Sequence, residues 1–94
     1  METALRGLIE KFIDEGLKPE RLKGIYQGLG DLLPLAKSKE DMLLGYFIGN
    51  IYGHLFYFVQ VLYHREPTLP ERVELAEIII KRAPEIREKI SHLI

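Results

Sequence analysis

Residues 42–64 constrain the fold more than any other segment, because these 23 consecutive positions contain no Asp, Glu, Lys or Arg. Within them, the stretch GYFIGNIYGHLFYFVQVLY (45–63) holds seven of the nine aromatic residues of the chain. A helix that is apolar or aromatic nearly all round is buried nearly all round. The segment is therefore a core helix, a membrane span, a subunit interface or a ligand site.

Flanking residues predict where this helix begins and ends. Ser38 and Asp41 form a pair that resembles a capping box, which places the helix start at Lys39. Glu66 and Pro67 are expected to end it, because a proline disfavours helical geometry at the residue that precedes it. The predicted helix, residues 39–66, is about 42 Å long and forms the centre of the fold.

Two shorter helices are predicted before this segment. Thr3 is expected to cap the first, which ends at Gly16 in the left-handed conformation. The second spans residues 19–33, with Pro19 in its first turn and Pro34 as its stop signal.

A fourth helix is predicted after Pro67, with Thr68 and Glu71 as its capping box. Its inward residues are expected to be Val73, Ala76, Ile79 and Ile80. Pro84 leaves the Ile80 carbonyl without its helical donor, which predicts a break or kink near Ala83. The last helical segment would then hold Ile86, Ile90 and Leu93.

Length and composition fit one domain, residues 1–94, since 47% of the residues are hydrophobic and 29% are charged. No strand signal is present, so the expected fold is all-α, a four- or five-helix bundle around the long central helix. The absence of cysteine excludes disulfides and thiolate metal sites. The balance of 13 basic and 14 acidic residues argues against a nucleic acid partner.

The charge-free segment is long enough to cross a bilayer. However, Asn50, His54 and Gln60 lie inside it, and the amphipathic neighbouring helices need it as their core. We therefore expect no membrane insertion and a cytoplasmic protein.

Thermolabile side chains are rare: the chain has one Asn, two Gln and no Cys, while Glu, Lys, Arg, Ile and Leu are abundant. In this composition it resembles the small uncharacterised helical proteins of hyperthermophilic archaea. The resemblance includes no motif, so it assigns no functional residue.

On a helical wheel the central segment separates into three sectors. A broad apolar arc is expected to face the core: Leu44, Phe47, Ile48, Ile51, Leu55, Phe58, Val59 and Leu62. A second sector carries three glycines four residues apart beside aromatic side chains: Gly45, Gly49, Gly53, Tyr52, Phe56 and Tyr63. The third is polar and includes Tyr46, Asn50, His54 and Tyr57.

Each glycine inside a helix costs about 0.5 to 1 kcal/mol relative to alanine, so close helix approach is expected to offset that cost. The approach is either internal, against Gly24 and Gly28 of the second helix, or between two copies of the chain. Because one long apolar helix exceeds what its partners can cover, we predict a homodimer through the sector of Tyr52, Phe56 and Tyr63. The leading function is thus an interaction or scaffold role, with itself or another protein as partner and no cofactor.

The polar sector supports a second interpretation. Tyr46, Asn50, His54 and Tyr57 lie three or four residues apart and would line a pocket for a small polar ligand. Alternatively, these side chains satisfy one another across a helix interface.

Two enzymatic alternatives remain. The residues Arg87-Glu-Lys-Ile-Ser-His92 resemble the catalytic motif of HEPN-type helical ribonucleases, except that Glu88 follows the arginine where a polar uncharged or basic residue is usual. The resemblance implies that Arg87 stabilises a transition-state phosphate and His92 transfers the proton. Glutamates 71, 74, 77, 85 and 88 resemble the acidic rows of helical pyrophosphohydrolases that bind magnesium, but interleaved basic residues favour a solvated face and no metal site.

Overall fold

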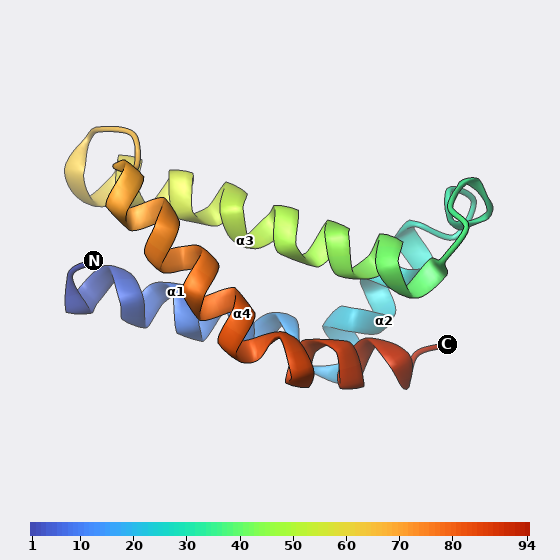
Figure 1. The fold of residues 1–94 in the computed structure, drawn as a ribbon. Coiled ribbons are helices and arrows are strands. Elements are labelled where there is room, and N and C mark those ends of the chain that lie inside the picture. Colours follow the sequence, from blue (N-terminus) through green and yellow to red (C-terminus); the bar gives the residue numbers. More distant parts are fainter.

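The computed structural model describes all 94 residues and confirms an all-α fold with four helices and no strand. The helices are α1 (Thr3–Gly16), α2 (Pro19–Gly28), α3 (Lys39–Tyr63) and α4 (Leu69–Ser91), and a short 3₁₀ turn, η1 (Leu33–Leu35), follows α2. The molecule measures 39 × 22 × 22 Å, and α3 runs along its whole length (Figure 1). Because α3 packs on α1, α4 and η1, it is the central helix that the sequence predicts.

The core is a single cluster of sixteen buried apolar side chains. In α3 these follow one line at four-residue steps, which we call the inner line: Leu43, Phe47, Ile51, Leu55 and Val59. They meet Leu5, Ile9 and Ile13 of α1 and five residues of α4: Leu75, Ile78, Ile79, Ile86 and Ile90. A line at this spacing keeps to one side of a helix, so α3 has one buried side and one free side.

The predicted apolar arc of α3 was partly wrong. Leu62, expected in the core, is 40% exposed, whereas Leu43 is buried in its place. In α4, Val73 and Ile80 point to solvent, while Leu75 and Ile78 take the core positions expected for them. Both errors have one cause. Each helix has an apolar face that is wider than the surface of the helix packed on it, so the packing angle decides which apolar residues are buried.

Helix ends follow the capping chemistry where polar caps exist. The Ser38 hydroxyl accepts a hydrogen bond from the Asp41 amide at 3.1 Å, as predicted. Thr68 and Glu71 form the predicted reciprocal capping box at the start of α4. Thr3, by contrast, is not a cap: the cap position is Glu2, which makes no side-chain capping bond.

Two helices are shorter than predicted. The helix α2 ends at Gly28 and not at Leu33, because Gly28 and Gly30 are poor helix formers and the chain continues in turns. The helix α3 ends at Tyr63, three residues before Glu66. There, His64 adopts the left-handed conformation (φ 55°), and its amide donates to the Gln60 carbonyl.

Of two further backbone predictions, the one for Gly16 was wrong, and for Pro84 the kink was correct and the break was not. No glycine has a positive φ, so Gly16 is not left-handed; Leu17 after it is also right-handed. Pro84 does not break α4, which continues to Ser91 and bends in its second half (Figure 1). Burial of Ile86 and Ile90 holds the final turns on the core, so the missing hydrogen bond produces a bend instead of a break.

Candidate functional site

The side of α3 opposite the inner line carries three glycines and three exposed aromatic residues. We call this surface the glycine face: Gly45, Gly49, Gly53, Tyr46, Phe56 and Tyr57. The exposed fractions are 46% for Tyr46, 40% for Phe56 and 61% for Tyr57, which are large values for aromatic side chains. No charged residue occurs in α3 beyond Asp41.

The glycines are not an internal seam. A Cβ atom built on Gly45, Gly49 or Gly53 would meet nothing within 4 Å, and the same holds for Gly24 and Gly28 of α2. The predicted internal packing of the two glycine rows is therefore wrong: nothing in the folded chain needs these positions to lack a side chain.

The predicted interface residues fall into two groups. Gly45, Gly49, Gly53 and Phe56 are exposed. Tyr52 and Tyr63 are half-buried and pack against the core of their own chain. The Tyr63 hydroxyl also donates to the Glu2 carboxylate at 2.9 Å, and hydrogen bonding and burial together raise the pKa of Tyr63, burial being the larger cause. On the glycine face, the exposed tyrosines are instead Tyr46 and Tyr57, which were predicted as ligand contacts.

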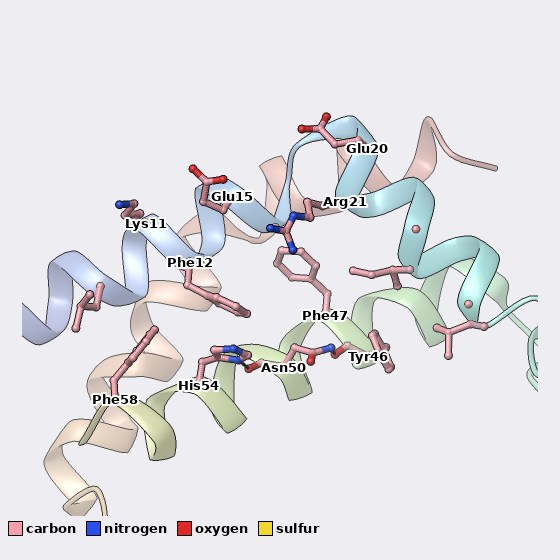
Figure 2. Close-up of a pocket in the computed structure, with 16 residues that line it drawn as sticks. Lys11, Phe12, Glu15, Glu20, Arg21, Tyr46, Phe47, Asn50, His54 and Phe58 are labelled. Atoms are coloured by element: carbon pink, nitrogen blue, oxygen red, sulfur yellow. Dashed lines mark hydrogen bonds between the residues drawn. The ribbon is translucent and has the colours of Figure 1, made fainter. Parts of the chain in front are cut away.

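A groove of about 860 Å³ separates α2 from α3 and α1 (Figure 2). Tyr46, Asn50 and His54 line it, so three of the four residues of the predicted ligand stripe reach one concave surface. Tyr57 lies outside it, against a shallow neighbouring hollow that also contacts Gly49 and Gly53. The groove and the glycine face thus share Tyr46, and Asn50 and His54 lie along their common edge.

Aromatic rings form one end of the groove. The Phe12 ring of α1 stacks on the His54 imidazole with 3.8 Å between ring centroids, and Phe58 meets the same imidazole edge-on at 5.8 Å. The Phe47 ring lies further along (Figure 2). The position of the Phe47 ring depends on Gly16, because a Cβ at residue 16 would stand 3.0 Å from that ring.

The polar groups of the stripe bond to their own helix. The Asn50 side-chain amide donates to the Tyr46 carbonyl at 3.0 Å, and His54 Nδ1 lies 2.9 Å from the Asn50 carbonyl. Since a carbonyl oxygen only accepts, Nδ1 carries a hydrogen, and Nε2 has no hydrogen-bond partner within the chain. These residues neither pair with one another across a helix interface nor form a catalytic array.

Beyond the groove, a partly buried ion pair fixes the α3–α4 turn. Arg65 donates to both carboxylate oxygens of Glu71, at 2.8 and 3.1 Å, and the Thr68 amide donates to Glu71 Oε1 at 2.8 Å. The Arg65 hydrogen bonds lower the pKa of Glu71 to about 2 against the opposing effect of burial, with the Thr68 amide adding to them. Glu71 therefore acts in the turn and does not join a metal-binding row.

The other candidate residues do not converge. Arg87 pairs with Asp41 at 3.5 Å and is half-exposed, and His92 is exposed just beyond the end of α4. Glu74 pairs with Arg6, and Glu85 pairs with Arg82. No group of three or more His, Asp or Glu side chains is placed to hold a metal ion. The ribonuclease and magnesium alternatives stay predictions that no geometry here favours.

Comparison with known protein families, curated proteins and solved structures finds no match for this chain. The class defined so far is a four-helix bundle whose central helix has one free, uncharged side and an adjoining aromatic groove. Those two surfaces are its candidate functional sites.

Proposed function

We propose that this protein is a small helical interaction module, and that two copies associate through the glycine face of α3. The observation that carries the proposal is the set of three open glycines in the middle of the helix. Each costs about 0.5 to 1 kcal/mol relative to alanine. Since nothing inside the chain offsets that cost, the benefit has to come from a partner that approaches the backbone closely.

The exposed area supports a partner of this kind. A compact monomer of 10.9 kDa exposes about 5,600 Å² by the usual scaling with mass, whereas this chain exposes 6098 Å². The excess, roughly 500 Å², is of the order of the 800 Å² that each subunit buries in a standard interface. The elongated shape contributes to this excess, and the free side of α3 accounts for exposed apolar residues within it.

A second copy fits the face better than an unrelated chain does. In an antiparallel pair of α3 helices related by a twofold axis at Gly49, Gly45 of each copy lies opposite Gly53 of the other. The same axis places aromatic side chains of one copy on both sides of the glycine row of the other. An uncharged surface also meets its own copy without repulsion.

The surroundings of the face favour a protein partner over a bilayer. By length and mean hydropathy, 1.3 over its most apolar window, α3 would pass as a membrane span, although the core helix of a soluble protein passes the same test. The Arg72 guanidinium of α4 lies 5.3 Å from the centroid of the Phe56 ring, about two turns before the C-terminal end of α3. A charge at that height would enter the hydrocarbon, whereas at the rim of a protein interface it stays in water.

Light scattering after size-exclusion chromatography tests the proposal. The wild type is expected at twice the chain mass of 10.9 kDa at micromolar concentration. Phe56→Glu is expected to give a folded monomer, because it places a charge in the apolar interface. The matched control is Ile80→Glu, a charge at another exposed apolar side chain, on α4, which should stay dimeric.

A wild-type monomer at every concentration would reject the proposal. So would a dimer that persists in Phe56→Glu and dissociates in Ile80→Glu, since the contact would then lie on α4. Sedimentation of the wild type with phospholipid vesicles, together with a monomeric mass in their absence, would assign the glycine face to a bilayer instead.

A further inference from the structure

The groove beside the glycine face exists because the wall formed by α2 has no side chains at two positions. Gly24 and Gly28 both line the groove, and a Cβ on either would meet nothing within 4 Å. Leu22 is the only buried residue of α2, so this helix packs loosely and leaves the space open. The volume of about 860 Å³ lies within the 300 to 1,000 Å³ range of small-molecule sites.

The opposite wall offers flat apolar surfaces. Phe12 and His54 stack with an interplanar angle of 23°, and the Phe58 ring stands edge-on to the same imidazole at 61° (Figure 2). Rings in these orientations accept a further planar group by stacking or by edge-to-face contact. The free Nε2 of His54 and the Tyr46 hydroxyl provide hydrogen-bonding groups beside the rings.

Two cationic residues line this space, and the side chain of one points into it. The Arg21 side chain extends from α2 toward the Phe47 ring, whereas Glu20 on the same helix points away from the groove (Figure 2). Glu15, on the α1 wall, pairs with Lys18 at 2.9 Å, which lowers the pKa of the Glu15 carboxyl, and the nearby Arg21 charge lowers it further. Arg21 itself takes part in none of the ion pairs of the protein. Arg21 is therefore available to bind an anion that also contacts the aromatic wall.

We propose that the groove between α1, α2 and α3 binds a small aromatic carboxylic acid. Its ring system lies against Phe12 and Phe58, and its carboxylate accepts hydrogen bonds from the Arg21 guanidinium. Guanidinium and carboxylate match in geometry as well as in charge, which favours a carboxylate over a neutral aromatic molecule of the same shape. This site adjoins the proposed dimer contact and shares Tyr46 with it, but neither Phe56 nor the glycine row of α3 lines the groove.

Titration calorimetry with 2-naphthoate tests the assignment, with the neutral 2-naphthalenemethanol as its matched ligand. The acid is expected to bind one molecule per chain and more tightly than the alcohol. Arg21→Met should weaken binding of the acid about fivefold, as expected for a partly exposed ion pair, and leave binding of the alcohol unchanged. Gly24→Leu should abolish binding of both, because its side chain fills the groove.

Gly24→Ala is the control for Gly24→Leu, since one methyl group enters open space and should leave binding intact. Phe56→Glu, which targets the proposed dimer, should also bind 2-naphthoate as the wild type does. The proposal is overturned if 2-naphthoate gives no binding heat, if Arg21→Met weakens the acid and the alcohol equally, or if Phe56→Glu removes binding. The last result would place the ligand on the glycine face.

Discussion

The two sides of α3 use the same four-residue spacing for opposite purposes. The inner line, from Leu43 to Val59, places a branched or aromatic side chain at every step and buries each one. The glycine row, from Gly45 to Gly53, repeats the spacing two residues later with no side chain and open space around each position. Large residues on the first side hold the chain to itself, and their absence on the second leaves a backbone surface that another helix can approach.

The clearest way to break this comparison is to truncate both sides. Ile51 is fully buried in the inner line, so Ile51→Ala should lower the free energy of unfolding by about 2 to 5 kcal/mol. Val61 is 55% exposed, and Val61→Ala should change it by less than about 0.5 kcal/mol. Urea denaturation at one fixed protein concentration measures both. Equal losses would mean that both sides of α3 are buried in solution.

The second prediction concerns the turn that sets which side of α3 receives α4. Because the folded-state pKa of Glu71 is lowered to about 2, its stabilising effect is fully present above its unfolded pKa, about 4.5, and is lost as the pH falls from there toward 2. The loss should be about 1 to 2 kcal/mol, since Arg65 remains partly in solvent.

Thermal unfolding of the wild type and Glu71→Gln over this pH range measures the effect. The difference in stability between the two proteins should be largest at neutral pH and should shrink as the wild-type carboxylate is protonated. A constant difference down to pH 2 would show that the charge of Glu71 contributes nothing to stability.

A third, smaller effect separates the cap from the ion pair in the same turn. Thr68→Ala removes the hydroxyl that accepts a hydrogen bond from the Glu71 amide but keeps the ion pair of Arg65 with Glu71. It should lower the free energy of unfolding by about 1 kcal/mol. Thr3→Ala is the matched control, because Thr3 makes no capping bond, and it should be neutral. If the two substitutions cost the same, the hydroxyl of Thr68 would not be the stabilising group.

Local chemistry explains what the sequence predicts correctly. The Ser38 and Thr68 caps and the start of α2 at Pro19 each depend on residues within one or two turns. The central place of α3 follows from one unbroken run of uncharged residues. The errors concern choices made at longer range. Val73 and Ile80 were assigned to the core because their spacing fits a buried stripe, but the packing angle of α4 on α3 selects Leu75 and Ile78 instead.

The groove shows the same limit. Tyr46, Asn50 and His54 could be grouped from their spacing on one helix, and they do share a concave surface. Phe12 and Arg21 could not be added, because they come from other helices and no local pattern links them to His54. Gly24 and Gly28 were recognised as unusual and interpreted as a close contact, whereas they form the open wall of a groove. A glycine in a helix therefore signals missing volume, and only the fold shows whether that volume is filled.

The final prediction uses that distinction on the glycine row. Alanine is the better helix former, and the Cβ of Gly49→Ala would meet no atom of its own chain. In the monomer, at concentrations below the dissociation constant of the proposed dimer, the substitution should raise stability by about 0.5 to 1 kcal/mol. In the dimer the same methyl group would stand between two closely packed helices and should lower stability, so the sign of the effect should reverse with protein concentration.

Thermal unfolding over a dilution series measures this change of sign, with Gly24→Ala as the control that should stabilise at every concentration. A Gly49→Ala protein that is more stable than the wild type throughout the series would show that no close helix approach occurs at Gly49. The two sides of α3 would then differ in burial, and the glycine row would not be a contact surface for another helix.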